Sequence, residues 1–541
     1  MAKSKNDSFR FRRLDSIGAA DAEEDKLYLQ QCFVETGHDK ILRDCSNPRR
    51  IILGRTGSGK TALLQRLAET EHRTIEIRPE SLALSYISNS TILTFVSDLG
   101  VKLDIFFKLL WRHVFTVELL KRHFEIRTEE GKQSFLERIR NLFRDKKHQK
   151  ALEYLETWGK SFWEETEYRI KELTSNLEEN IRDSLGAKLA PLSFNTESIQ
   201  RLSETQKQEV IQRAQHVVNQ VQIRQLSDII DLLDEVLNDP QKRYYLTIDR
   251  LDEDWIEDRL RYRLIRALIE TVRDFRKVRH AKLIIAIRYD LLDRVIKLTR
   301  DEGFQEEKYE SLFLPIDWTK DHLVTALDNR INFLVKQRYT KRKVAYSDLL
   351  PEKIGKERTI DYILDRTLMR PRDVIVFFNE CISLATDKPN INRTMIREAE
   401  GQYSRNRLRA LADEWHADYP NFIDFAMLLK GVKPHFKISA LPISTCEDFC
   451  LDFTIRGVTE KDSLSTMAAQ VADALLDVKD FRKHLFLVFH RIGLVGLKLD
   501  AFDKVIWITA GRASVSSAEV ADNTRVYVHP AFWRVMGVSD R

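Results

Sequence analysis

The chain has 541 residues, more than one hydrophobic core usually serves, so two to four domains are expected. Hydrophobic residues make up 43% and charged residues 32%, which is typical of a folded, helix-rich protein. The formal net charge is only +5, too small to indicate nucleic-acid binding, and uninterrupted apolar runs long enough for a membrane span are absent from the sequence. Five scattered cysteines fit a reducing cytoplasm, and a zinc site at Cys446 and Cys450 is disfavoured because no second ligand pair accompanies them.

The chain begins with a basic, polar stretch that runs to Arg13 and lacks the apolar core of a secretion signal. We expect residues 1–27 to form a disordered tail.

A glycine-rich loop follows at Gly54–Thr61 and has the Walker A pattern. It lies between an apolar run that predicts a buried strand, residues 50–53, and a helical segment, residues 62–67. Its glycines let backbone N–H groups face a phosphate, and the helix adds its positive end. Lys60 is expected to reach the β- and γ-phosphates of ATP, and Thr61 to ligate Mg²⁺. The predicted nucleotide contacts are Gly54, Arg55, Thr56, Gly57, Ser58, Gly59, Lys60, Thr61 and Ala62.

A long insertion comes next, since about 180 residues separate the loop from the next functional motif and a compact core needs far fewer. Charged residues interrupt an apolar run at 91–120, which favours a buried amphipathic helix. Further on, apolar residues recur at helical spacing and predict long antiparallel helices that project from the core. Such an arm is either structural or, as we favour, a docking surface for a partner. The recurring residues are Leu155, Trp158, Phe162, Ile170, Leu173, Leu177, Ile181, Val210, Ala214, Val217 and Val221.

The second half of the nucleotide site is predicted after an apolar strand at 243–248. Asp249 follows directly at its carboxyl end, where parallel sheets place ligands, and is assigned to the Mg²⁺ shell. Asp252 and Glu253 come within one turn and could orient and deprotonate the attacking water. Glu253 is the first choice and Asp252 the second. An acidic helix start is the alternative explanation of these three residues.

Two later segments carry arginines at the ends of predicted elements, and a polar residue at a strand tip can touch the γ-phosphate. Arg288 ends a third predicted strand, residues 282–287, and a fourth apolar run at 312–316 precedes a helix that starts near Lys320. Strands that alternate with helices predict a parallel sheet. Pro371 is favourable in the first turn of a helix, so Arg370 and Arg372 are expected at a helix start. Two solvated arginines are the alternative.

A separate C-terminal domain is predicted to begin near residue 401. Residues 477–492 predict a helix that buries Phe481, Leu485, Val488 and Phe489, and residues 504–509 and 524–528 predict a hairpin with a polar tip. Helices followed by such a hairpin describe a winged-helix module. Because the tip carries few positive charges beyond Arg512, protein docking is at least as well supported as DNA binding.

Together the loop, Asp249–Glu253, Arg288 and the Arg370–Arg372 helix resemble the AAA-related STAND and KAP classes of P-loop ATPases. The chain looks most like bacterial members with a helical insertion and a C-terminal winged helix, often encoded in anti-phage defence islands. The resemblance implies that Arg288 is the first sensor and Arg372 the second, on a helical lid. KAP proteins often carry membrane helices in the insertion, and this sequence departs from them there.

The expected fold class is therefore an α/β P-loop NTPase core with a helical insertion, a helical lid and a winged-helix-like domain. The expected domains are a tail at 1–27, a core at 28–90 and 225–318, the insertion at 91–224, the lid at 319–400 and the C-terminal domain at 401–541. We expect a cytoplasmic, homo-oligomeric ATPase switch or scaffold, not a membrane protein, that acts with a separate effector protein docked on the insertion or the C-terminal domain. The main alternative is a DNA-remodelling ATPase similar to origin-recognition proteins, with nucleic acid held by the winged helix. A nucleotide-binding protein without turnover is a third possibility.

Overall fold

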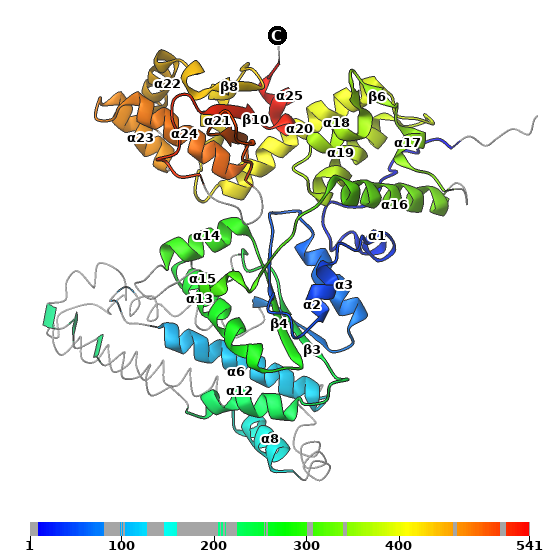
Figure 1. The fold of residues 1–541 in the computed structure, drawn as a ribbon, viewed down its shortest axis with the longest axis vertical. Helices are drawn as coiled ribbons and strands as arrows, with labels where there is room; N and C mark the ends of the chain where they lie inside the picture. Colours follow the sequence, from blue (N-terminus) through cyan, green and yellow to red (C-terminus); the bar gives the residue numbers. More distant parts are fainter. Residues whose placement is uncertain are drawn as a thin grey trace, which may run out of the picture. The chain divides into compact units, whose positions relative to one another are not determined.

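The computed structural model describes residues 9–79, 98, 100, 103–126, 145–158, 204–205, 207–208, 211–212, 224–253, 255, 258–299, 307–338, 343–457, 462–508 and 515–539. The chain divides into two compact units (Figure 1). The sheet unit comprises Gly37–Gly54 and Lys60–Pro315. The C-terminal unit comprises Met1–Thr36, Arg55–Gly59 and Ile316–Arg541, so it includes the middle of the glycine-rich loop. Within the described residues, no helix combines the length and hydropathy needed to cross a bilayer.

A five-stranded, all-parallel sheet forms the centre of the sheet unit, with the order β2-β3-β4-β1-β5. The predicted parallel α/β core is confirmed, and four of its strands lie where the sequence places them. The sequence analysis missed β2, whose alternating exposure marks an edge strand. The strands are β1 (Ile51–Leu53), β2 (Thr74–Ile77), β3 (Tyr244–Ile248), β4 (Ala281–Ile287) and β5 (Phe313–Pro315).

The strand order creates a switch point beside β1. The chain crosses from β1 to β2 on one side, whereas β5 pairs with β1 on the other side. Ligands of open α/β sheets bind outside the carboxyl ends of the strands at such a point. The loop after β1 and the turns after β3 and β4 end at this edge of the sheet.

Helices cover the sheet and extend its hydrophobic core. The helix α6 packs against α13 and α12 (Figure 1), and its Trp111 is fully buried with its indole donating to the Leu264 carbonyl at 3.0 Å. The helices are α2 (His38–Arg43), α3 (Lys60–Thr70), α6 (Asp104–His123), α8 (Lys146–Trp158), α12 (Arg224–Val236), α13 (Asp258–Asp274), η2 (Phe275–Lys277), α14 (Tyr289–Leu298) and α15 (Glu307–Glu310).

The described part of the predicted insertion does not project from the core. The amphipathic helix expected within 91–120 exists as α6, and both α6 and α8 belong to the same hydrophobic cluster as the sheet, because Phe107, Phe115 and Leu152 are buried in it. The prediction of a buried amphipathic helix is confirmed by α6, and α8, which carries Leu155 of the predicted arm, packs in this core instead of projecting from it. The recurring apolar positions from Phe162 to Ile181, and all four of those from Val210 to Val221, lie outside the described residues.

The C-terminal unit is mainly helical and has its own core. The helix predicted near Lys320 is α16, and Pro371 occupies the first turn of α19 as expected, with Val374, Phe377 and Phe378 buried beneath it. Its elements up to the long helix are α1 (Lys26–Cys32), α16 (Lys320–Arg338), α17 (Tyr346–Leu349), β6 (Lys353–Ile354), β7 (Glu357–Arg358), α18 (Thr359–Asp365), α19 (Pro371–Leu384) and α20 (Arg393–Trp415).

The predicted domain boundary between residues 400 and 401 falls inside α20. Asn392 caps this helix by accepting a hydrogen bond from the Met395 N–H at 3.0 Å, and the buried face continues through Tyr403 and Leu411. Gly401 lies within α20 and does not interrupt the helix. The lid and the C-terminal domain therefore share one helix, which corrects the predicted division.

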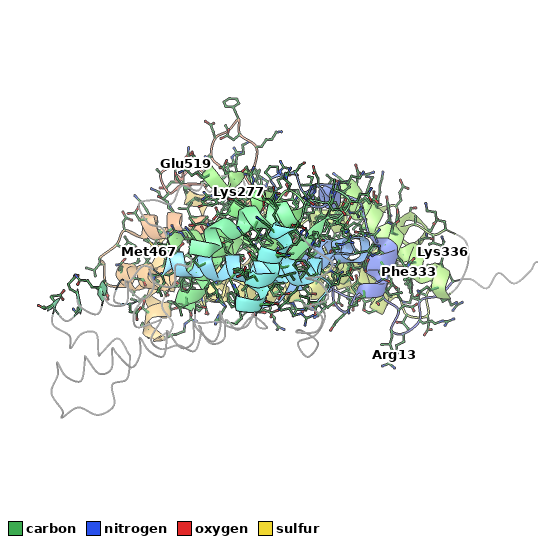
Figure 2. All side chains as sticks on the ribbon, turned by 90° about the horizontal axis from the view of Figure 1, so that it is seen from below. Arg13, Lys277, Phe333, Lys336, Met467 and Glu519 are labelled. Carbon is green, nitrogen blue, oxygen red and sulfur yellow. The ribbon has the colours of Figure 1, made fainter. Side chains whose placement is uncertain are left out.

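The prediction of a disordered tail is wrong for residues 9–27. Phe11 and Ile17 are buried in the core of the C-terminal unit, and the Ile17 N–H donates to the Asn379 Oδ1 at 2.9 Å. Just beyond, Tyr28 of α1 packs edge-on against Phe333 of α16, with ring centroids 5.0 Å apart. Figure 2 labels Phe333 and Lys336, both on α16. The prediction weighed the basic charge of this stretch and overlooked its apolar anchors.

The described residues after α20 form five α-helices, three short 3-10 helices and a three-stranded antiparallel sheet of order β8-β10-β9. The helix predicted at 477–492 is α24, and its four predicted core residues are buried. The predicted hairpin is partly wrong: β10 pairs with Val495–Lys498, whereas residues 504–508, the described part of the other predicted strand, contribute a single bridge, from Ile506 to Leu497. Strand β9 was missed because its glycine, over which Val505 and Trp507 pack closely, weakens the strand pattern. The elements are α21 (Phe422–Ala426), η3 (Met427–Leu429), β8 (His435–Lys437), η4 (Ile438–Ala440), α22 (Ile443–Ile455), α23 (Ser463–Ala472), α24 (Val478–Ile492), β9 (Val495–Lys498), β10 (Arg525–Val528), η5 (Pro530–Phe532) and α25 (Trp533–Met536).

Candidate functional site

The glycine-rich loop has the backbone that its sequence predicts. It leaves β1 at Gly54, whose N–H donates to the Ile287 carbonyl of β4 at 3.4 Å. Gly57 and Gly59 adopt left-handed conformations, with φ of +78° and +95°, which L side chains rarely tolerate. Lys60 then begins α3, a helix of 11 residues. A tight turn that opens a helix is the arrangement that binds phosphate through backbone N–H groups.

Lys60 and Thr61 lie at the start of α3 with their functional atoms at the strand edge. The Lys60 Nζ donates to the Gly54 carbonyl at 3.1 Å, so its ammonium folds back over the loop. The Thr61 Oγ1 donates to the Asp249 Oδ2 at 2.7 Å, although 188 residues separate the two. The fold thus brings together the hydroxyl and the carboxylate that were predicted to share a metal ion. Ala62 follows in the first turn of the same helix.

The surroundings of Asp249 suit an ion. Burial raises the pKa of this carboxyl above its ordinary 3.8, against the lowering effects of the Thr61 hydroxyl and the Lys60 charge. Its second oxygen accepts from the Arg250 N–H at 2.9 Å, which fixes its orientation. A hydroxyl and a carboxylate oxygen side by side fit Mg²⁺, which takes one or two protein oxygens and completes its shell with phosphates and water.

The turn after β3 holds the two candidate bases in different surroundings. Asp252 accepts from the Arg288 Nη1 at 3.0 Å, and Arg288 also makes two hydrogen bonds to Asp290, at 3.0 and 2.9 Å. Arg288, predicted at the strand tip, does follow β4 directly, and it links the turn after β3 to the residues after β4. Glu253 is about half exposed and lies 3.5 Å from the Arg250 Nη1. The structure therefore brings Asp252 and Arg288 together and leaves Glu253 on the more open side of the turn.

In the C-terminal unit, three residues hold successive carbonyls of the loop. The Arg370 Nη1 donates to the Thr56 carbonyl at 2.6 Å, and the Trp318 indole donates to the Ser58 carbonyl at 2.8 Å. Between them, the Arg372 N–H approaches the Gly57 carbonyl at 3.5 Å. The sequence analysis did not single out Trp318. Its only signal is its position just before the helix that starts at Lys320.

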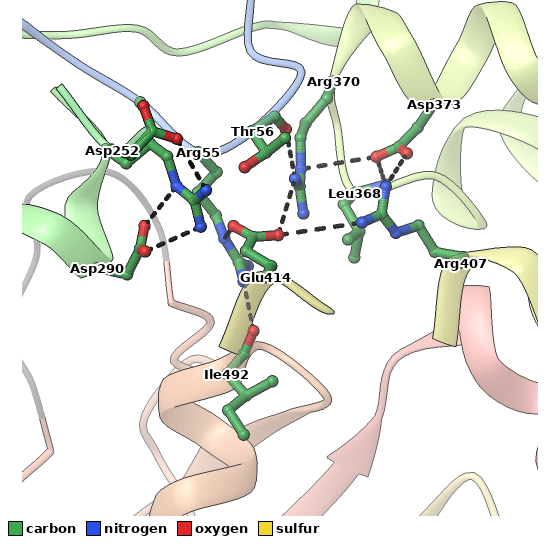
Figure 3. Close-up of polar contacts among 12 residues, drawn as sticks. Arg55, Thr56, Asp252, Asp290, Leu368, Arg370, Asp373, Arg407, Glu414 and Ile492 are labelled. Atoms are coloured by element: carbon green, nitrogen blue, oxygen red, sulfur yellow. Dashed lines mark hydrogen bonds and ion pairs between the residues drawn. The ribbon is translucent and has the colours of Figure 1, made fainter. Parts of the chain in front are cut away.

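A buried charge cluster lies behind these contacts (Figure 3). Glu414 lies 3.7 Å from both Arg55 and Arg370, and 4.0 Å from Arg407. Asp373 accepts from the Arg407 Nη1 at 2.9 Å and lies 3.6 Å from the Arg370 Nε. Burial raises the pKa of Asp373, but the adjacent arginines outweigh it and hold this pKa below 3.8. The sequence analysis missed Asp373, Arg407 and Glu414, which a charged pattern inside long helices does not distinguish from a solvated face.

Arg55 ties the loop further to the end of the chain. Besides its ion pair with Glu414, it donates to the carbonyl of Ile492, the last residue of α24 (Figure 3). A cation at the carbonyl end of a helix is favourable because this end is electronegative. Arg55 thus acts away from the phosphate side of the loop, which was not expected from its predicted role as a nucleotide contact.

The predicted second sensor, Arg372, is less buried than Arg370. Its Nε donates to the Ala20 carbonyl at 2.9 Å, and its Nη2 lies 3.8 Å from Asp21, with 31% of its side chain exposed. Arg370 is only 4% exposed. The alternative reading of two solvated arginines is therefore wrong for Arg370.

Comparison with known proteins gives similarities to a family model and to solved structures. Residues 321–412 match the model of the FunZ-associated C-terminal helical domain. A solved Walker-type ATPase of Pyrococcus abyssi is similar over 96% of this chain and 98% of that chain, with 12% sequence identity and a TM-score of 0.37. No protein of curated function matches the chain significantly.

Proposed function

We propose that the chain binds ATP with Mg²⁺ and hydrolyses it. The observation that carries this proposal is the 2.7 Å contact between the Thr61 hydroxyl and the Asp249 carboxylate, beside a loop whose glycines have the required left-handed backbone. Two residues 188 positions apart meet at the carboxyl edge of a parallel sheet, where such sheets bind ligands. An acidic helix start, the alternative for Asp249, does not account for this meeting, because Asp249 ends β3 and α13 begins only at Asp258.

Each group at this edge has a distinct task in the proposed reaction. The loop amides and the α3 N-terminus bind the phosphates, and Lys60 exchanges the Gly54 carbonyl for phosphate oxygens. Thr61 and Asp249 would hold Mg²⁺, which supplies charge neutralisation to the leaving phosphate. Nearly all catalysis of phosphoryl transfer comes from such positioning and electrostatics.

Glu253 remains the proposed base that orients the attacking water. One oxygen of Asp252 accepts from Arg288 at 3.0 Å, whereas the Glu253 side chain is about half exposed and so is accessible to water. Arg288, at the tip of β4, would then report the γ-phosphate by changing its partner from Asp252.

We further propose that this ATPase is an oligomeric switch that acts with an effector protein in bacterial anti-phage defence. The resemblance of its motifs to STAND and KAP ATPases supports this role, and so does the link between loop and lid helix through Arg370. ATP would order the lid and a subunit interface, and hydrolysis would release them. The test is a plaque assay with the gene and its genomic neighbours: protection by wild type and its loss in Lys60→Ala support the proposal, and equal plaque counts with and without the genes argue against it.

The features of the C-terminal unit favour a protein partner over DNA. The helix α24 is largely buried, so little of it remains to enter a groove. In the exposed connection after β9, Lys498 and Lys504 are balanced by Asp500 and Asp503, around a Phe502 that is 97% exposed. A segment without net charge gains little from DNA phosphates. Stimulation of ATP hydrolysis by added DNA would instead support the remodelling alternative.

Calorimetry with MgATP tests the nucleotide assignment. Lys60→Ala should abolish measurable binding, because the β- and γ-phosphates lose their cation. Lys356→Ala, at an exposed lysine in the C-terminal unit, is the matched control and should bind as wild type does. Equal affinities of wild type and Lys60→Ala would refute the assignment of the loop.

A further inference from the structure

Hydrogen bonds from Arg370 and Trp318 to carbonyls of the glycine-rich loop determine the direction in which the N–H groups of the loop point. A trans peptide unit is planar, so its C=O and the following N–H point in opposite directions. Arg370 fixes the carbonyl of Thr56 at 2.6 Å, and Trp318 fixes that of Ser58 at 2.8 Å. The N–H groups of Gly57 and Gly59 must therefore point to the side of the loop opposite these two side chains.

We infer that Arg370 and Trp318 are positioning residues that orient the phosphate-binding amides of the loop. The inference rests on the proposed nucleotide binding and deepens it. The Ser58 N–H, between those of Gly57 and Gly59 in the chain, already donates to the Arg55 carbonyl at 3.1 Å and closes the turn. Gly57 and Gly59 thus contribute alternate N–H groups to one concave face, which is a backbone arrangement that binds anions.

Arg370 is itself held in a way that suits this task. It is almost fully buried, and its guanidinium lies 3.6 Å from Asp373 and 3.7 Å from Glu414. These carboxylates aim the side chain at the loop before any nucleotide binds. Preorganised groups cost no reorganisation when the ligand arrives.

This role differs from γ-phosphate sensing in a measurable way. Backbone amides in such a loop bind phosphates that ADP and ATP share, whereas a sensor contacts only the phosphate that ADP lacks. Loss of a positioning residue should weaken both nucleotides by the same factor. Loss of a sensor should change their ratio.

The first test replaces Trp318 with phenylalanine, which keeps an aromatic ring and removes the N–H donor. Trp533→Phe is the matched control, because this partly buried indole also donates at 2.8 Å to a carbonyl, that of Val528, which is not in the loop. Trp318→Phe should weaken ADP and a non-hydrolysable ATP analogue equally, by about fivefold, the scale of one neutral hydrogen bond. KM for ATP should rise by a similar factor while kcat stays within about twofold. Both variants should show the same small change in melting temperature.

The second test replaces Arg370 with methionine, and Arg366→Met is its control. Arg366 is also buried, donates to the Tyr362 carbonyl at 3.0 Å and pairs with Glu400 at 2.9 Å, but it does not contact the loop. Both variants break a buried ion pair, so both should melt earlier. Only Arg370→Met should also weaken both nucleotides, by about 30-fold, since charged hydrogen bonds are the stronger ones.

The possible results distinguish a failure of the positioning role from a failure of the proposed nucleotide binding. If wild type binds nucleotide but both loop-facing variants bind ADP and the ATP analogue as their controls do, the positioning role is wrong and the proposed function stands. If Arg370→Met fails to fold, Trp318→Phe decides alone. If wild type binds neither nucleotide, the proposed function fails and the positioning role fails with it.

Discussion

Asp373 is the carboxylate on which the buried charge cluster of the C-terminal unit depends most. It is 1% exposed, accepts from the Arg407 Nη1 at 2.9 Å and lies 3.6 Å from the Arg370 Nε. Its Oδ2 also accepts from the Leu368 N–H at 3.4 Å. Asp373→Asn keeps the size of the side chain but leaves two buried arginines with one carboxylate fewer between them.

The expected loss in free energy of unfolding is large because Arg370 and Arg407 stay buried. Removing one member of a buried ion pair costs about 3–5 kcal/mol, since the remaining charge is desolvated and uncompensated. At about 2–4 °C per kcal/mol for a unit of this size, the melting temperature should fall by roughly 6–20 °C. Guanidinium unfolding followed by circular dichroism measures the difference. Glu380→Gln, on the same helix and without an ion pair among the described contacts, should change stability by less than about 0.5 kcal/mol.

The stability difference between wild type and Asp373→Asn should change with pH in a defined direction. The two arginines hold the pKa of Asp373 below 3.8, so its charged form is favoured in the folded state. The stabilisation is therefore complete above the ordinary pKa and is lost as the pH falls towards the folded pKa. The gap between wild type and Asp373→Asn should be full at pH 7 and shrink below about pH 3.8. A gap under about 1 kcal/mol at pH 7, or one that widens in acid, would contradict the assigned role.

Three further predictions concern the nucleotide cycle. Glu253→Gln should still bind ATP while turnover falls by roughly 10²–10⁴; a larger loss in Asp252→Asn would show that Asp252 is the base. Because burial raises the pKa of Asp249 above 3.8, Mg²⁺-dependent ATP affinity should fall on acidification at a higher pH than an ordinary aspartate would give, and Asp249→Asn should remove this dependence in fluorescence titrations. Arg372→Ala should bind ATP and ADP with nearly equal affinity and lose any nucleotide-dependent change of assembly in mass photometry. A mutant that still assembles differently with the two nucleotides would exclude Arg372 as the sensor.

The sequence predicted the sheet unit well because its signals are local. A glycine-rich turn requires left-handed backbone at Gly57 and Gly59, and that requirement is visible in the residue types. The strands at 244–248 and 281–287 are mainly apolar runs, each followed directly by a polar residue, which is the pattern of buried parallel strands. Asp249 could be placed because the carboxyl ends of such strands meet at one edge.

The C-terminal unit was harder to predict because its important contacts join segments far apart in the chain. Glu414 lies near the end of a 23-residue helix, and only the fold shows that it faces Arg55 and Arg370 from two distant segments besides Arg407 of its own helix. Phe11 and Ile17 are anchors in a segment whose charge suggests a tail. Apolar periodicity shows which side of a helix is buried, but it does not show which polar residues on that side pair with charged groups from other segments.

The helix start at Pro371 shows how local backbone geometry divides two similar residues. Arg370 precedes the helix as its N-cap, with φ −125° and ψ 142°, whereas Arg372 is already in the first turn, so their side chains diverge. Arg370 reaches the Thr56 carbonyl and is held by two buried carboxylates, whereas Arg372 reaches the Ala20 carbonyl and an exposed Asp21 at 3.8 Å. A buried residue held by a loop carbonyl and two buried carboxylates can orient the loop but cannot readily change partners. A residue held by one carbonyl and one exposed charge can move to a phosphate at little cost. If this helix start distinguishes ATP from ADP, Arg372 is therefore the residue that does so, and Arg370 keeps the loop in the shape that both nucleotides require.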